Sequence, residues 1–367
     1  MPILEKASAR RRHHIGDFLA VLLLVAVAGC LVWLWWHEKH PKPSGKHKAI
    51  INVSTGGARL ITPVEKPKPK PIIIAPQSPT DFPRPVQNAF EAQVALARRA
   101  ISPGSLDAAI GSQTRAAIAA FQRSQKLFES SSLDTNTRPL LTLAAPLLTN
   151  YLVTTNDLAR LQPIGKTWVA KSEQTALDYE TLLELVAEKS HAYPLLIQKL
   201  NPDVVWTNVT AGTSLKIPDV NYPEPSDQAT FVIIHLSEKF LEAFDAETNL
   251  LLHCPCSIAA KVEKRPVGEL HVAVVAPHPN YTFDPAVFPE SPEAQAIGHK
   301  LILPPGPNNP VGVAWIGLDK PGYGMHGTPV PEQVGRTESH GCFRLANWDA
   351  EYMVKLVWVG MPVEVVP

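Results

Sequence analysis

Near the C-terminus, one cysteine lies close in sequence to two histidines and an arginine. His326 opens a His-Gly-Thr run, and after twelve intervening residues the chain reads SHGCFR over 339–344. A thiol becomes a useful nucleophile only when a neighbouring group takes its proton or stabilises the thiolate. Either His326 or His340 could take the proton of Cys342. These residue types therefore indicate nucleophilic catalysis by a thiol.

The residues that flank Cys342 suit acyl transfer. Gly341 has no side chain, so backbone N–H groups at 341–342 could approach a substrate and form an oxyanion hole. If the segment is extended, Arg344 lies on the same face as Cys342 and could bind a substrate carboxylate with its fork of donors. A lone cysteine is usually a packing residue. All of these residue types within the nineteen positions 326–344 favour an active site over coincidence.

A zinc site is the alternative chemistry, because four nitrogen or sulfur ligands would suffice. The available ligands are His326, His340, Cys342, His253, Cys254 and Cys256. Cys254-Pro-Cys256 lacks the two-residue gap of a zinc knuckle, so zinc is the minor alternative. The two cysteines alternate in phase along a predicted strand, which indicates thiols packed in a core. Their oxidation stays open for an exported protein.

From residue 230 onwards, the hydrophobic pattern changes to the alternation that is typical of β-strands. Residues 231–258, 271–276 and 354–366 carry this pattern, with a turn expected over 245–249. They predict a β-rich domain over 226–367, about 140 residues long and within the usual size of a single domain. The candidate residues lie in the second half of this domain.

Residues 226–367 resemble the L,D-transpeptidase (YkuD) catalytic family. The matching runs are RPVGELHV at 265–272, LPPGPNNPVGVAWIGL at 303–318, YGMHGTP at 323–329 and SHGCFRLANWDA at 339–350. The resemblance implies that Cys342 is the nucleophile and becomes a thioester. It also implies that His326 is the general base, with its ring oriented by the backbone carbonyl of Gly327.

Further roles follow from the same resemblance. The residues expected to line the site or contact substrate are Tyr323, Ser339, His340, Gly341, Cys342 and Arg344. Gly341 and Cys342 would offer oxyanion donors, and Ser339 would steady the loop. Arg344 would bind a carboxylate of the donor stem peptide. No metal and no cofactor is expected.

The resemblance implies peptidoglycan as the substrate. The thiol would attack between the L-centre of diaminopimelate at stem position three and D-Ala at position four, releasing D-Ala. The acceptor stays open: a stem amine gives a 3→3 cross-link, water gives an L,D-carboxypeptidase, and a protein lysine tethers a protein to the wall. Family analogy favours cross-linking. A non-catalytic wall-binding scaffold is the alternative from another class, and the intact candidate residues argue against it.

Two smaller modules are predicted in the middle of the chain. Within 87–148, the helical run DAAIGSQTRAAIAAFQ resembles the peptidoglycan-binding domain, with Ala108 where that family has glycine. Residues 149–225 resemble a βααβ LysM domain through two short amphipathic helices and the closing run GTSLKIP at 212–218. The resemblances imply binding to the wall and to its N-acetylglucosamine-containing glycan. A degenerate spacer is the alternative for the LysM-like module.

The N-terminal part has the composition of a membrane anchor followed by a stalk. Residues 18–36 contain no charge and are long enough to cross a hydrocarbon core of about 30 Å. We expect a cytoplasmic tail over 1–17, a single-pass membrane helix over 18–36 and a Pro- and Lys-rich linker over 37–86. Processing as a lipoprotein at Cys30 is the alternative.

The net charge of zero is the sum of two unlike parts. Residues 1–72 carry twelve Lys or Arg against four Asp or Glu, so the rest of the chain has a net charge of −8. An acidic folded part excludes nucleic acid as a partner, because a phosphate-binding surface would be basic. A substrate outside the cytoplasmic membrane places the catalytic domain in the periplasm. The sequence as a whole predicts an anchored, multi-domain α+β protein.

Overall fold

The computed structural model describes residues 72, 81–337, 339 and 341–367. These residues belong to one compact unit, Lys66–Pro367. The predicted tail (1–17), the predicted membrane helix (18–36) and most of the predicted linker (37–86) lie outside the described residues. In the part of the chain that the structure describes, no helix is both long enough and apolar enough to span a bilayer.

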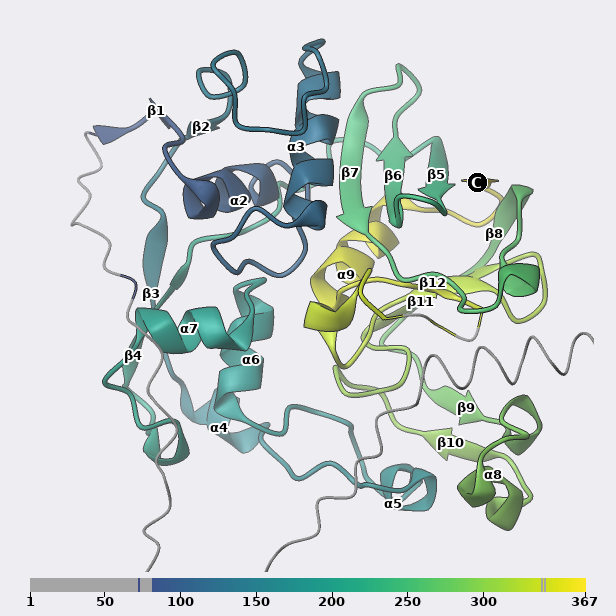
Figure 1. The fold of residues 1–367 in the computed structure, drawn as a ribbon. Coiled ribbons are helices and arrows are strands. Elements are labelled where there is room, and N and C mark those ends of the chain that lie inside the picture. The colour runs from purple at the N-terminus through teal and green to yellow at the C-terminus, as the bar shows by residue number, and fades with distance from the viewer. Residues whose placement is uncertain (1–71, 73–80, 338, 340) are drawn as a thin grey trace, which may run out of the picture. The chain divides into compact units, whose positions relative to one another are not determined.

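The C-terminal domain is built on one eight-stranded sheet (Figure 1). The strand order is β13-β12-β11-β8-β14-β5-β6-β7, with parallel pairing only at β14/β5 and β12/β13. The strands are β5 (Phe231–His235), β6 (Phe240–Phe244), β7 (Leu250–Pro255), β8 (Gly268–Pro277), β11 (Ala314–Leu318), β12 (Gly324–His326), β13 (Phe343–Arg344) and β14 (Pro362–Val366). Alternate residues such as Val232 and Ile234 are fully buried, which confirms the predicted β-rich C-terminal fold.

The prediction of a strand from residue 354 is wrong for its first three residues. Val354–Leu356 end the helix α9 (Asn347–Leu356), and β14 begins only at Pro362. Met353 and Leu356, three residues apart, are both buried in the core of the sheet domain. A short apolar run does not by itself distinguish a strand from the end of a helix, because both can be buried.

The middle of the chain contains the two helices predicted within 87–148. The elements are β1 (Arg84–Pro85), α2 (Ala89–Ala97), α3 (Ser112–Ser124) and β2 (Thr142–Leu143). Ala108 has a φ of 66°, in the left-handed region that glycine adopts more easily. Its N–H donates to the Gln93 side chain at 2.9 Å. The turn therefore keeps a glycine-like backbone although alanine occupies it.

The next segment contains the predicted pair of helices between two strands, with two helices more. Its elements are β3 (Leu148–Leu152), α4 (Thr155–Ala159), α5 (Trp168–Ser172), α6 (Leu182–Lys189), α7 (Pro194–Leu200), η2 (Trp206–Asn208) and β4 (Ser214–Pro218). β3 and β4 pair antiparallel. α4 and α5 span five residues each, too few for a hydrophobic period to reveal them. One hydrophobic cluster extends from Val86 to Val220, so both middle segments share a core.

A small unit is inserted between β8 and β11 of the sheet domain. It consists of β9 (Tyr281–Phe283), α8 (Pro292–Ile297) and β10 (Leu301–Leu303), with β9 and β10 antiparallel. Its aromatic core receives Trp168 from α5, whose ring stacks on Phe283 with centroids 4.4 Å apart. The insertion therefore packs against the middle of the chain.

Candidate active site

The candidate site lies on one face of the β12/β13 pair, at the edge of the sheet (Figure 1). The parallel register pairs His326 with Arg344 and Met325 with Phe343. Because successive side chains alternate between faces, His326 and Arg344 share one face of the pair, and Cys342 lies two residues before Arg344, in the bend that leads into β13. Met325 and Phe343 occupy the other face and are buried in the core. Arg344 is an electrostatic neighbour of both His326 and Cys342: burial lowers the pKa of His326 and the charge of Arg344 adds to that shift, whereas burial raises the pKa of Cys342 and the same charge opposes it.

Gly327 orients the imidazole of His326. Ring Nδ1 lies 2.6 Å from the Gly327 carbonyl oxygen. Because a carbonyl only accepts, Nδ1 carries the proton and Nε2 has the lone pair of a base. Burial lowers the pKa of His326 from 6.5 to about 4, and the hydrogen bond to Gly327 opposes this shift. The ring is therefore neutral at neutral pH.

Trp315 and two glycines form the surface beside His326. Trp315 on β11 pairs with His326 on β12, and the two rings lie 5.7 Å apart between centroids. A Cβ on Gly324 would lie 2.8 Å from the indole, and one on Gly317 would lie 2.9 Å from its Nε1. Glycine at both positions lets the indole lie against the sheet. Nothing in the sequence assigned a role to Trp315.

Cys342 is a neutral thiol in this structure. Its Sγ donates to the Gly322 carbonyl at 3.4 Å. Burial raises the pKa of the thiol from 9.0 to about 11, while the Gly324 N–H and the charge of Arg344 act in the opposite direction. A thiol with this pKa needs a base to take its proton during reaction. His326, on the strand that pairs with β13, has the unprotonated nitrogen for that task.

Ser339 holds the turn that presents Cys342. Its Oγ donates to the Cys342 carbonyl at 2.5 Å and accepts from the Gly341 N–H at 3.2 Å. The backbone of Ser339 is hydrogen-bonded to 258–260. The Gly341 N–H, predicted as an oxyanion donor, is therefore already bonded to Ser339. His340, predicted to line the site, lies outside the described residues.

The two remaining predicted substrate contacts flank this turn. Arg344 donates from Nη2 to Thr337 Oγ1 at 3.4 Å, and burial lowers the pKa of its guanidinium. Tyr323 packs against the core of the sheet domain. The ammonium group of Lys320 lies 5.4 Å from the centroid of the Tyr323 ring. Lys320 thus places a cationic group on the Tyr323 ring.

Tyr281 is a neighbour of Cys342 that the sequence did not reveal. Burial raises the pKa of Tyr281, and negative charge at Cys342 or Asp284 raises it further. Tyr281 comes from β9, in the insertion, some sixty residues before the cysteine. No spacing pattern links the two residues along the chain, so only the fold could place them together.

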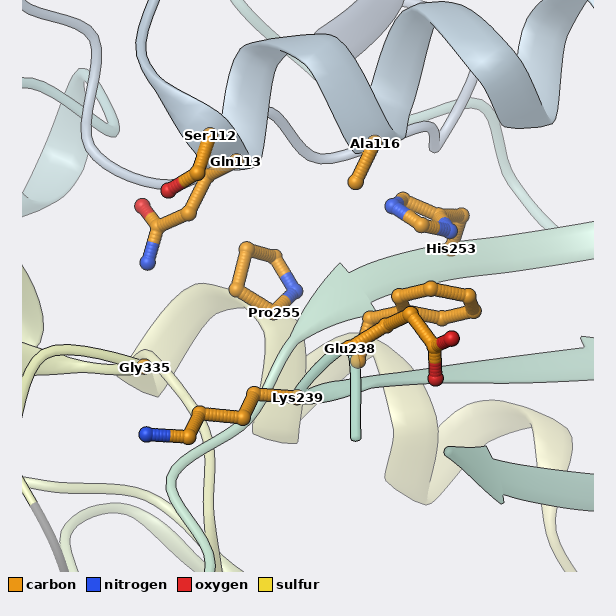
Figure 2. Close-up of a pocket in the computed structure, with 9 residues that line it drawn as sticks. Ser112, Gln113, Ala116, Glu238, Lys239, His253, Pro255 and Gly335 are labelled. Carbon is orange, nitrogen blue, oxygen red and sulfur yellow. The ribbon is translucent and has the colours of Figure 1, made fainter. Parts of the chain in front are cut away.

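The cavity shown in Figure 2 lies elsewhere. It has a volume of about 270 Å³ and lies between α3 and the strands β6 and β7. Gln113 of α3 borders it and donates from Nε2 to the Val334 carbonyl at 2.6 Å. None of the described residues that line the cavity is a candidate catalytic residue. The cavity belongs to the contact between the helical segment and the sheet domain.

Cys254 and Cys256 are buried free thiols, as predicted for core residues. Burial raises the pKa of both, that of Cys256 to about 12. His253 binds Glu242 through Nδ1 at 3.0 Å. Among the described residues, which leave out His340, no three His, Cys, Asp or Glu side chains are grouped so that they could hold a metal ion.

These features define a class of protein: a sheet-based domain with a thiol, a neutral imidazole and a guanidinium on the two strands at one edge and in the bend that leads into β13. A family model described as the L,D-transpeptidase catalytic domain, YkuD, matches residues 229–365. The sheet domain therefore belongs to the L,D-transpeptidase (YkuD) catalytic family and is an enzyme domain of that type. The resemblance read from the sequence is confirmed for this part of the chain.

Individual relatives agree with the family model. The chain is 26% identical over 188 residues to a Bacillus licheniformis protein named as an L,D-transpeptidase YkuD, covering 51% of this chain and 94% of that protein. It is 26% identical over 182 residues to an Escherichia coli protein named as an L,D-transpeptidase YbiS, covering 46% and 54%. This chain thus spans only about half the length of the E. coli relative. A solved L,D-transpeptidase from Mycobacterium smegmatis is 18% identical, with a TM-score of 0.30 over 43% of this chain and 65% of that one.

Proposed function

We propose that this protein is a peptidoglycan L,D-transpeptidase with Cys342 as its nucleophile. One observation carries the proposal: Nδ1 of His326 is bound to the Gly327 carbonyl, and the β12/β13 register pairs His326 with Arg344, two residues after Cys342. The match of the family model to 229–365 supports the class of reaction.

In the first half-reaction, His326 Nε2 takes the proton of Cys342 as the sulfur attacks the carbonyl carbon at stem position three. N–H groups of the 341–342 turn stabilise the oxyanion that forms. Gly341 must release Ser339 Oγ to take part, because its N–H is bonded there at rest. The amide bond then breaks, His326 returns the proton to the departing D-Ala amine, and a thioester remains.

In the second half-reaction, an amine attacks the thioester carbon and the sulfur leaves. His326 takes the proton of the amine and returns it to Cys342, which regenerates the thiol. Arg344 binds a carboxylate of the donor stem through its forked donors. A stem amine as acceptor gives the cross-link, whereas water gives a shortened stem and a protein lysine gives a tethered protein.

The test is a mass measurement on purified full-length protein incubated with disaccharide tetrapeptides, beside the Cys342→Ala variant. We expect loss of D-Ala and a cross-linked dimer from the wild type, and neither product from the variant. A carbapenem should add its mass to Cys342. The absence of D-Ala release, of a dimer and of an adduct would overturn the proposal, and release of D-Ala without a dimer would identify a carboxypeptidase.

We infer that the middle segments bind the wall. The alignment to the Bacillus protein covers 188 residues, which is more than 229–365 contains, so the similarity extends beyond the catalytic domain. The antiparallel β3/β4 pair with α6 and α7 supports a LysM-like module in 149–225. Titration of N-acetylglucosamine oligomers into the Cys342→Ala protein should saturate. No binding would favour the spacer alternative.

We also propose that residues 18–36 anchor the protein and leave the catalytic domain in the periplasm. The uncharged run of nineteen residues supports the anchor, and the Cys30 processing site supports the lipoprotein alternative. The Cys30→Ser variant separates the two. An anchored protein keeps its mass and its membrane fraction, whereas a lipoprotein loses its lipid mass.

A further inference from the structure

The side chain of Asn347 lies against the loop that orients the catalytic histidine. Asn347 is the first residue of α9 and is 1% exposed. Its Oδ1 accepts from the Thr328 N–H at 3.0 Å and from the Val313 N–H at 3.3 Å. Thr328 directly follows Gly327, whose carbonyl holds Nδ1 of His326. The amide of Asn347 thus supports the backbone that supports the imidazole.

The fit around this amide is tight. A Cβ on Gly327 would lie 2.2 Å from Asn347 Oδ1, and one on Gly312 would lie 2.0 Å from the same atom. Gly312 also has a φ of 62°, which favours glycine. Because both glycines let the backbone approach Oδ1 so closely, a rotation of the Asn347 amide would move the 312–313 and 327–328 segments with it.

The other end of the amide is bound from outside the catalytic domain. Asn347 Nδ2 donates to Oε2 of Glu188 at 2.9 Å and to the Pro307 carbonyl at 3.2 Å. Glu188 belongs to α6, in the segment that resembles LysM. With both donors of Nδ2 and both acceptor positions of Oδ1 in use, the amide has only one orientation that satisfies all four groups.

Glu188 is itself held in place. Its Oε1 accepts from the Tyr179 hydroxyl at 3.0 Å. Burial raises the pKa of Glu188 to about 7, the donors Asn347 and Tyr179 oppose this shift, and the carboxylates of Glu184 and Glu351 add to it. Oε2 accepts from Asn347 whether or not Oε1 carries a proton. The contact with Asn347 therefore needs an oxygen acceptor at this position but not a charge.

We propose that Glu188 is a positioning residue for catalysis: it fixes the amide of Asn347 and, through it, the Gly327–Thr328 backbone that orients His326. The inference rests on the proposed function of His326 as the base. It assigns to the middle of the chain a part in the chemistry that is independent of any binding to the wall. Glu188 contacts neither the substrate nor a reacting atom.

The test compares Glu188→Leu with Glu188→Gln in the full-length protein. Leucine removes the acceptor and leaves an Nδ2–H of Asn347 unpaired, so kcat should fall by about 10- to 100-fold with KM unchanged, as for a misplaced catalytic group. Glutamine keeps an oxygen acceptor, so it should restore kcat. Tyr179→Phe is the matched control, because it removes the other partner of Glu188 without touching Asn347.

Thermal unfolding separates this role from a loss of folding. Glu188→Leu and Tyr179→Phe should both lower the unfolding midpoint, but only the leucine variant should lower kcat. Full kcat in Glu188→Leu, no rescue by glutamine, or an equal loss in Tyr179→Phe would overturn the inference. The alkylation rate of Cys342 by iodoacetamide gives an independent measurement, because the thiol needs His326. If wild-type protein shows no turnover but alkylation slows in Glu188→Leu, the proposed transpeptidase reaction fails, while the role of Glu188 in positioning His326 as the base of the thiol stands.

Discussion

Two regions of the sheet domain each contain a histidine and a cysteine. The two pairs differ in their separation along the chain and in the partner that binds each histidine. On β7, His253 and Cys254 are neighbours in sequence. Neighbours on a strand point to opposite faces, so Cys254 packs in the core while His253 binds Glu242. His326 and Cys342 are sixteen residues apart in sequence, but the β12/β13 register pairs His326 with Arg344, two residues after Cys342. Pairing between strands, not proximity along the chain, creates the candidate site.

The two histidines are also held by different partners. His253 binds Glu242, which also accepts from the exposed Arg123 Nη2 at 2.5 Å, so that ring is bonded to a carboxylate that is itself ion-paired. His326 binds the neutral carbonyl of Gly327. A carbonyl fixes the tautomer without adding charge, and burial then keeps the ring neutral. His326 is thus a neutral imidazole on the strand that pairs with the segment after Cys342.

The largest effect is expected from the cysteines. Cys342→Ala should abolish D-Ala release and the carbapenem adduct, because the other described thiols, Cys254 and Cys256, are fully buried. Cys254→Ala should keep kcat, because its sulfur is buried in the core. Product mass and kcat measure both variants. Activity that survives in Cys342→Ala, or disappears in a folded Cys254→Ala, would contradict the assignment of the nucleophile.

The second largest effect on activity is expected from the histidines. His326→Gln should lower kcat by about 10²- to 10⁴-fold, the usual contribution of general acid–base catalysis. His253→Gln is the matched control and should keep kcat, although the loss of its bond to Glu242 should lower the unfolding midpoint. Steady-state kinetics with thermal unfolding distinguish the two outcomes. Equal losses of kcat in both variants would remove the distinction between the two regions.

The pH dependence gives a third, smaller effect. Burial lowers the pKa of His326 from 6.5 to about 4, so the base stays unprotonated as the pH falls through 6.5. We expect kcat/KM to stay level from about pH 7.5 down to about pH 5.5, where a histidine with its ordinary pKa would already lose about tenfold. If kcat/KM instead falls with a midpoint near the ordinary histidine pKa of about 6.5, the His326 ring is more exposed to water than in this structure.

The strands and the catalytic run could be predicted because their signals are local. Alternating burial on β5 and the SHGCFR run at 339–344 are visible in short windows of sequence. The end of α9 was predicted as strand, because Val354–Leu356 looks alike in either state. The helices α4 and α5 are too short to show a period, so the LysM-like segment was predicted with two helices fewer than it has.

The side chains that sequence reasoning missed are those that act across long separations. Tyr281 reaches the neighbourhood of Cys342 from the insertion, and Glu188 reaches Asn347 from α6. A single chain without a periodic pattern contains no signal for such contacts, since they depend on how segments pack. Trp315 lay inside a matched run, but only the fold shows that glycines make room for its indole beside His326.

Arg344 should show a more modest effect, on binding. Arg344→Lys keeps the positive charge but loses the planar fork that can bind a carboxylate at two points. We expect KM for the tetrapeptide to rise by about three- to tenfold with kcat nearly unchanged, since bidentate geometry adds to a charge that lysine retains. Arg123→Lys, at the β7 region, should leave KM unchanged. A fall in kcat alone would instead place Arg344 in the chemical step.

Serine in place of Cys254 and serine in place of Cys342 should affect stability and activity in opposite order. The changes in stability are the smallest effects that we expect. Cys254 is 0% exposed, so a hydroxyl there is buried without its water and should cost about 1–3 kcal/mol of stability. Cys342 is only partly exposed and burial raises the pKa of its thiol too, but its Sγ has an acceptor in the Gly322 carbonyl, so the hydroxyl in Cys342→Ser stays paired and should cost less than about 1 kcal/mol. Activity should follow the reverse order, because a serine hydroxyl is a far weaker nucleophile than a thiol with the same base. Unfolding midpoints and kcat, measured on both variants, decide this. If Cys254→Ser unfolds at the wild-type midpoint, the Cys254 site is not closely packed. Burial alone then does not explain why Cys254 is inert and Cys342 is reactive.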